Sequence, residues 1–273
     1  MQLCAAIASL SLGASALAHG TSHERIDAAS RAIAGQPEDA ALYLQRATLH
    51  LEHGDLKACL SDVDEAERRQ TQDLGVALVR GRALVAGGRL GEAKAILDRF
   101  ITAHPDHAAA LMERARVLGA LEHESEAADD FVRAMSHVPQ PEPDHVFELV
   151  SILCRAGRES DALSAIDKAL KATPGVPSLV ERAVRIETGL GNHDGALRRI
   201  GDAMQTAKVK EPLMARRAGL LAQAGRISES IAAWRELQVR LAAMPETERG
   251  SHAMSSLAVR SRHALASLSG VQP

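Results

Sequence analysis

The sequence predicts an all-α solenoid, in which helical hairpins stack in a row. Small residues recur along the 273-residue chain every 34 residues, with one interval of 35, at Cys59, Ala93, Ala127, Ala162, Ala196 and Ser230. A fixed period of this size is typical of stacked helical hairpins. Aromatic residues make up only 2% of the chain, whereas hydrophobic residues make up 46%. The core must therefore be built from Ala, Leu, Val and Ile at close helix–helix distances.

Residues 1–18 are expected to be a secretory signal peptide and not part of the fold. The stretch from Leu3 to Leu17 carries no charge and leads to the small-x-small site Ala16-Leu17-Ala18. A membrane anchor is the alternative, but a span needs about 20 apolar residues. Met1-Gln2 lacks the usual basic residue, which leaves open that translation starts elsewhere. We therefore expect a periplasmic or secreted bacterial protein with no membrane span after cleavage.

An N-terminal capping helix is expected in residues 19–37, with its helical part at 24–34. It ends near Gly35 and Pro37 and lies in phase with the second helix of a hairpin whose first helix is missing. Solenoids need terminal caps with one polar face to stay soluble.

Six hairpins are expected in residues 38–245, each with the same pattern. A first helix carries an arginine before a small residue, at Arg46, Arg80, Arg114, Arg182 and Arg217. A turn glycine follows, since glycine adopts a positive φ without a Cβ clash. The third turn has Glu122 in its place, and the fifth is expected to hold one extra residue near Gly191. The second helix has the small residue, and a large apolar residue follows four positions later, at Val63, Leu97, Phe131, Ile166, Ile200 and Trp234.

The two remaining segments are a joint and a C-terminal cap. Prolines at 139, 141 and 143 separate the third and fourth repeats, and we interpret them as a stiff joint inside one array because the repeat phase continues. Residues 246–273 are expected to form a capping helix, from about 251 to 268. Its apolar residues are expected to face one way, at Met254, Leu257, Leu265 and Leu268, while Arg260 and Arg262 face another.

This pattern resembles the tetratricopeptide repeat over about residues 39–241, most closely in repeats one, three, four and six. The resemblance implies a right-handed superhelix of about six helix-turn-helix repeats, whose first helices line a concave groove. It also implies a non-catalytic scaffold or adaptor that holds a protein or peptide. Together with the signal peptide, it suggests a role outside the cytoplasm.

The family's groove positions, projected onto this chain, give a mixed apolar and basic face. They are Leu44, Thr48, Leu51, Leu78, Arg82, Val85, Met112, Arg116, Phe147, Ser151, Glu181 and Arg185. Arginine binds carboxylates through a bidentate fork, so an acidic peptide is the expected partner. A solvated charged face is the alternative. The family's clamp for chaperone carboxylates uses groove asparagines, and the chain's one asparagine, Asn192, lies in a turn.

Two arginine–aspartate pairs are expected to lock hairpins. Asp62 and Asp130 precede the large residues of second helices, within reach of Arg46 and Arg114. The alternative is a ladder of arginines that binds an anionic ligand.

Metal binding is a second hypothesis. The pairs His50/His53 and His104/His107 have spacings that could share a metal, but no third ligand stands at a suitable distance in the sequence. Surface or packing roles are the better account. Cleavage after Ala18 would make His19 the N-terminal residue, with His23 close by, and an amine with an imidazole can bind copper. This gives the alternative function of an exported copper-handling protein.

Other chemistry finds little support in the sequence. Gly189-x-Gly191 departs from the dinucleotide fingerprint and lies in a helical turn. No nucleophile with a general base is evident, so we expect neither an enzyme nor a cofactor. The net charge of −3 gives no basic face for nucleic acid. Cys4 would leave with the signal peptide, and Cys59 is expected to be a small buried residue that cannot reach Cys154. The sequence does not predict the oligomeric state.

Overall fold

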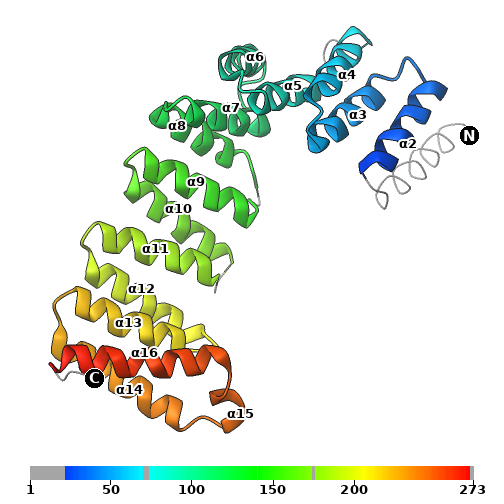
Figure 1. Ribbon diagram of the computed structural model, residues 1–273. Coiled ribbons are helices and arrows are strands. Elements are labelled where there is room, and N and C mark those ends of the chain that lie inside the picture. The colour runs from blue at the N-terminus through cyan, green and yellow to red at the C-terminus, as the bar shows by residue number, and fades with distance from the viewer. Residues whose placement is uncertain (1–21, 70–73, 140, 174–175, 271–273) are drawn as a thin grey trace, which may run out of the picture. The chain divides into compact units, whose positions relative to one another are not determined.

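The computed structural model describes residues 22–69, 74–139, 141–173 and 176–270, and every regular element within them is a helix (Figure 1). Contacts between the helices divide the chain into two compact units, Met1–Pro141 and Glu142–Pro273. The division falls in the proline tract, which sequence reasoning placed inside a single array. Proline has no backbone N–H and a fixed φ, so it cannot continue a helix but can open one. Pro143 does so as the first residue of the next helix.

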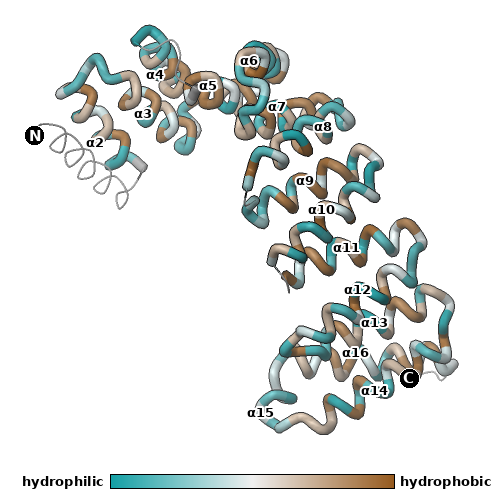
Figure 2. Tube along the Cα trace, turned by 180° about the vertical axis from the view of Figure 1, so that it is seen from behind, coloured by the Kyte–Doolittle hydropathy of each residue, from teal (hydrophilic) through white to brown (hydrophobic). Residues whose placement is uncertain are grey.

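The described part of unit 1 starts with α2 (Ser22–Gly35), which packs on the first of three hairpins. This is the expected N-terminal capping helix, although residues 19–21 of that segment lie outside the described residues. The hairpins are α3 (Ala40–His53) with α4 (Leu56–Arg69), α5 (Leu74–Ala86) with α6 (Leu90–Ala103), and α7 (Ala108–Ala120) with α8 (Glu124–Ser136). Each second helix also contacts the first helix of the following hairpin, so the unit is a continuous stack. Hydrophobic residues cover most of α5, which lies in the middle of this stack (Figure 2).

Unit 2 repeats the arrangement with three further hairpins. They are α9 (Pro143–Arg155) with α10 (Glu159–Ala172), α11 (Pro177–Gly189) with α12 (His193–Thr206), and α13 (Glu211–Gln223) with α14 (Ile227–Ala242). The short α15 (Glu246–Arg249) then leads into α16 (His252–Leu268), which packs on α14 and α13. The four apolar residues predicted for one face of the C-terminal helix all join the cluster around Trp234, while Arg260 and Arg262 are exposed. The orientation predicted for this helix is confirmed.

The recurrent small residues form the closest contacts inside each hairpin. All six are fully buried, and the residue twelve positions earlier on the first helix is buried as well, at Ala47, Gly81, Ala115, Val150, Val184 and Ala218. The large residues four positions after the small ones are also buried. Small side chains let the two backbones approach, and the large side chain then fills the space towards the neighbouring hairpin. This confirms the packing predicted from the sequence.

The turns confirm the glycine pattern and correct one detail. Positive φ angles recur once per hairpin, at Gly54, Gly88, Glu122, Gly157, Gly191 and Gly225. Glu122 adopts the same left-handed conformation, with φ of 63°, as the glycines around it. The expected extra residue in the fifth turn was wrong, because residues 190–192 join α11 to α12 just as 121–123 join α7 to α8. The buried position of α11 is therefore Val184, and Arg182 lies one residue out of phase with Arg114.

Candidate functional site

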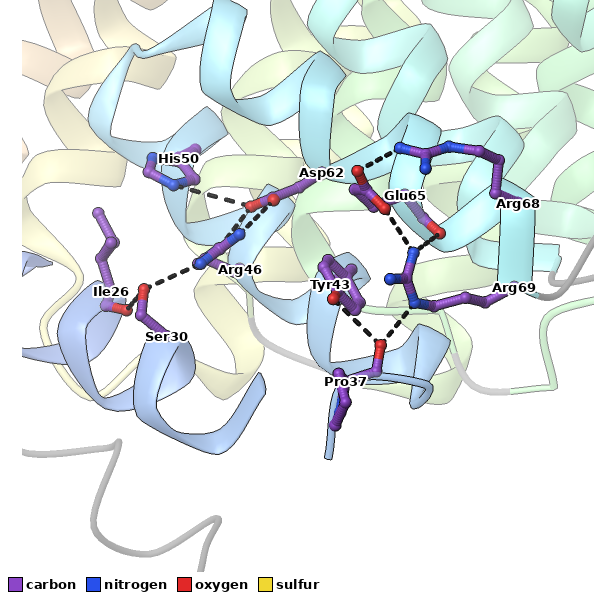
Figure 3. A network of polar contacts seen from close by, with 10 residues as sticks. All are labelled: Ile26, Ser30, Pro37, Tyr43, Arg46, His50, Asp62, Glu65, Arg68 and Arg69. Atoms are coloured by element: carbon purple, nitrogen blue, oxygen red, sulfur yellow. Dashed lines mark hydrogen bonds and ion pairs between the residues drawn. The ribbon is translucent and has the colours of Figure 1, made fainter. Parts of the chain in front are cut away.

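Two arginine–aspartate pairs join the helices of the first and third hairpins, as the sequence predicted. Arg46 donates from Nε and Nη2 to the two carboxylate oxygens of Asp62, at 2.8 and 2.6 Å (Figure 3). Arg114 holds Asp130 in the same bidentate way, at 2.6 and 2.7 Å. The hydrogen bonds to Asp62 raise the pKa of Arg46, although its partial burial opposes this. Both aspartates are buried, at 4% and 8% exposure, so each needs its arginine.

Each of these arginines also reaches the helix before its own hairpin, which sequence reasoning missed. Arg46 Nη1 donates to Ser30 Oγ on α2 at 3.0 Å (Figure 3). Arg114 Nη1 donates to Asp98 Oδ1 on α6 at 2.9 Å. Burial alone would raise the pKa of Asp98, but hydrogen bonds from Lys94 and Arg114 lower it overall. One guanidinium thus ties three helices together.

The fifth hairpin holds a similar network with the charges exchanged. Arg199 lies on the second helix, 69 residues after Asp130, and binds Asp167 on α10 through Nη1 and Nη2, at 2.5 and 3.2 Å. Its Nε donates to Glu187 on α11 at 3.1 Å. Asn192 is the N-cap of α12. Its side-chain amide donates to Glu187, and its side-chain oxygen accepts from the Gly195 amide at 3.1 Å. No sequence expectation covered this network, because the predicted pairs all use an arginine of a first helix.

These contacts argue against the hypothesis that the first-helix arginines form a ladder for an anionic ligand. Arg46 and Arg114 are bound as described, and Arg80 forms 2.8 Å ion pairs with both Asp64 and Glu67 on α4. Arg46 and Arg114 carry the charge that buried carboxylates need, whereas Arg80 joins α5 to exposed carboxylates of the preceding hairpin. Pairing within one hairpin or between two hairpins therefore accounts for the arginines of the first three repeats.

The predicted groove residues are divided between the two units. Eight of them lie on α3, α5 and α7, and α3 contacts α5 as α5 contacts α7, so these first helices form one surface in unit 1. We call these eight the first-helix surface: Leu44, Thr48, Leu51, Leu78, Arg82, Val85, Met112 and Arg116. The other four, Phe147, Ser151, Glu181 and Arg185, lie on α9 and α11 of unit 2.

Exposure differs among these residues. Met112 is only 5% exposed, so its prediction as a contact residue was wrong and it belongs to the core. The four leucine and valine side chains of the first-helix surface are partly buried and pack against core clusters, at Leu44, Leu51, Leu78 and Val85. They present part of their apolar surface to solvent.

A carboxylate that sequence reasoning missed links the two arginines of this surface. Glu113 on α7 accepts from Arg82 Nε at 2.8 Å and from Arg116 Nη1 at 2.9 Å. The Glu113 side chain is 14% exposed, whereas that of Arg82 is 53% exposed. The Arg82–Glu113 ion pair joins the second hairpin to the third and stabilises their stacking. Because Glu113 also binds Arg116, two guanidinium groups lie close together on this surface. In unit 2, Arg216 and Glu181 form a comparable contact at 3.3 Å.

The histidines and cysteines form no metal centre of three ligands within the part of the chain that the structure describes. His19 lies outside that part. His50 Nε2 approaches Asp62 at 3.7 Å. His104 and His107 both contact the Phe100 ring, the former tilted and the latter edge to face. Cys59 is fully buried, and burial raises the pKa of its thiol to about 11. Cys59 and Cys154 are both free thiols, and the prediction of a small buried role for Cys59 is confirmed.

The described helices include none that combines the length and apolar character needed to cross a bilayer.

Comparisons with known proteins agree with this architecture. Residues 78–136 match the tetratricopeptide repeat family model. YrrB, described as a TPR protein with an unusual peptide-binding site, is 22% identical with a TM-score of 0.51, over 66% of this chain and 92% of YrrB. A thermophilic TPR protein of Thermus thermophilus is 23% identical with a TM-score of 0.53, over 65% of this chain and 96% of its own.

A third structure covers more of the molecule. A tetratricopeptide repeat protein of Parabacteroides merdae has a TM-score of 0.52 and 13% identity, over 93% of this chain and 97% of its own. No curated protein sequence matches the chain. Identities this low show the fold alone. Residues 78–136 therefore match the tetratricopeptide repeat family, and the hairpin contacts that recur in both units give the described chain the tetratricopeptide repeat fold.

Proposed function

We propose that the chain is a non-catalytic scaffold that binds a protein segment on the first-helix surface of unit 1. One observation carries the proposal: Arg82 and Arg116 meet at Glu113 and share this surface with partly exposed leucines and a valine. Apolar contacts give such a surface affinity, and guanidinium groups give it preference for carboxylates. The fold also supports this function, since the related YrrB is described as binding a peptide.

The chemistry favours an acidic segment with apolar neighbours. Glu113 accepts from both arginines through Oε1 and holds their guanidinium groups on the first-helix surface. An acidic side chain of the partner can bind the exposed part of the Arg82 guanidinium. Arg82, with half of its side chain exposed, can make that contact without leaving its position.

A display library of short peptides, sorted for binding to the full chain, tests this proposal. Acidic residues beside Leu, Ile or Phe should be enriched. The R82Q/R116Q variant should bind the selected peptides at least about tenfold less tightly, the loss expected for charge-assisted contacts. R31Q is the matched control, since Arg31 is exposed on α2 outside this surface. A library without enrichment, or equal binding by R82Q/R116Q, would contradict the proposal.

A second variant separates binding from stability. Glu113→Gln keeps the shape of the side chain and removes the charge that competes for the two arginines. An acidic peptide should then bind more tightly, even if the hairpins stack less firmly in the free protein. Weaker peptide binding by a folded E113Q variant would mean that the arginines only hold the hairpins together.

We also propose that the scaffold acts outside the cytoplasm. Support comes from the charge-free stretch ahead of Ala16-Leu17-Ala18, which favours export to the periplasm or beyond. Mass spectrometry of the protein from its native host should find a chain that starts at His19. A chain retaining residues 1–18 in the cytoplasmic fraction would contradict export. Such a start would also supply the amine that the copper hypothesis needs, but that hypothesis stays second to the scaffold.

A further inference from the structure

Two histidines meet where the capping helix joins the first hairpin. His23 lies in the first turn of α2, and His53 is the last residue of α3. Their rings contact each other edge to face, with centres 4.6 Å apart and planes at 81°. Sequence reasoning had placed them in separate metal candidates, His23 with His19 and His53 with His50. The fold instead brings one member of each candidate together.

The packing of α2 on α3 fixes the distance between these two histidines. Ala29 and Ile33 of α2 are buried, and Ile33 belongs to the same apolar cluster as Tyr43 of α3. Arg25 of α2 and Glu52 of α3 form an ion pair at 3.3 Å beside the histidines. Both ring positions are therefore set by helices, and only the side-chain torsions remain free.

The ring separation suits a shared metal ion. A zinc–imidazole bond is about 2.0–2.1 Å, which places a ring centre roughly 3.2 Å from the ion. Two rings at bond angles of about 90–110° then have centres roughly 4.5–5.2 Å apart. The observed 4.6 Å falls inside this range. Turning the rings to point one nitrogen each at a common position would need no movement of either helix.

We propose that His23 and His53 bind one late first-row divalent ion, Zn²⁺ or Cu²⁺, which clamps the capping helix to the first hairpin. Imidazole suits these metals, whereas Mg²⁺ and Ca²⁺ prefer oxygen ligands. Both histidines are exposed, so solvent can supply the remaining ligands. This site is independent of the first-helix surface. It shares His23 with the amino-terminal copper hypothesis but does not need the amine of His19.

Thermal unfolding of the full chain with and without ZnCl₂ or CuCl₂ tests the site. In the full chain His19 is not N-terminal, so the amine complex cannot form. An ion that binds the folded state raises the unfolding midpoint, and we expect a rise of about 2–4 °C at saturating metal. MgCl₂ should leave the midpoint unchanged.

Single variants assign the effect to the pair. H23A and H53A should each abolish the metal-induced rise, and H252A, which changes an exposed histidine of unit 2, should keep it. Since alanine at these exposed positions is expected to leave the fold intact, the apo midpoints serve as the folding check. The Cu²⁺ electron paramagnetic resonance spectrum should show two coordinating nitrogens in the parent chain and one or none in the variants. The proposal is overturned by an absent rise with both ions, or by a rise that survives in H23A or H53A.

Discussion

The third hairpin in unit 1 and the fifth hairpin in unit 2 have first helices and turns of the same length, yet opposite polar networks. In the third, Arg114 on the first helix is bound by Asp98 and Asp130 on the second helices before and after it. In the fifth, Arg199 on a second helix is bound by Asp167 and Glu187. Both hairpins place one guanidinium between two carboxylates, but they distribute these groups differently over their helices.

The exchange has consequences for the neighbouring residues. Glu187 is only 6% exposed and lies over Gly195, where a Cβ would come within 2.6 Å of its carboxylate. In the third hairpin, the position equivalent to Gly195 is Glu126. Its side chain is exposed and pairs with His123 at 2.9 Å. Moving the carboxylate to the first helix therefore makes a glycine necessary on the second.

The largest expected effect comes from removing the guanidinium in either network. Arg114→Ala and Arg199→Ala should each lower the free energy of unfolding by about 3 kcal/mol, because each leaves two carboxylates facing each other with at least one of them buried. Hydrogen exchange should speed up in α6–α8 for the first variant and in α10–α12 for the second. Arg133→Ala is the control, since its 3.1 Å pair with Asp106 is exposed and should be worth well under about 1 kcal/mol. A large loss in only one network would show that the two are not equivalent.

A smaller effect is expected at the glycine that accommodates Glu187. Gly195→Ala should destabilise the chain by about 1–2 kcal/mol, even though alanine is the better helix former by about 1 kcal/mol. The reason is that the new Cβ displaces Glu187 and Asn192. Glu126→Ala at the matching position should change stability by less than about 0.5 kcal/mol. Denaturant titration measures both, and a more stable G195A chain would contradict the steric argument.

The smallest effect is expected in the turns of the same two hairpins. Glu122 has a φ of 63°, a region that costs a side chain about 1 kcal/mol relative to glycine. Glu122→Gly should raise the unfolding free energy by up to about 1 kcal/mol, while Gly191→Ala should lower it by about the same amount. Shifts of the unfolding midpoint in opposite directions for the two variants would confirm that both turns need a residue in the left-handed conformation. Equal signs would mean that Glu122 has a compensating contact.

The sequence alone determined the hairpins, their number, the turns other than the fifth, and two of the arginine pairs. It did so because a repeated unit must bury the same small and large residues in the same places, so the period can be read from one chain. It also gave the orientation of α16, since Leu257 and Leu265 share one face of the helix while Arg260 and Arg262 lie outside that face.

Only the tertiary structure decided which side chains from different hairpins meet. Glu113 between Arg82 and Arg116, Asp98 beside Arg114, and His23 against His53 all join residues that no repeat spacing pairs. It also decided that Met112 is core and that Arg199 replaces an aspartate. The physical reason is that close packing of the helix backbones restricts residue size at the same positions of every hairpin, so small and large residues recur periodically in the sequence. Charge balance restricts only the net charge of the side chains that meet between helices. Several distributions of arginine and carboxylate residues over those helices give the same net charge.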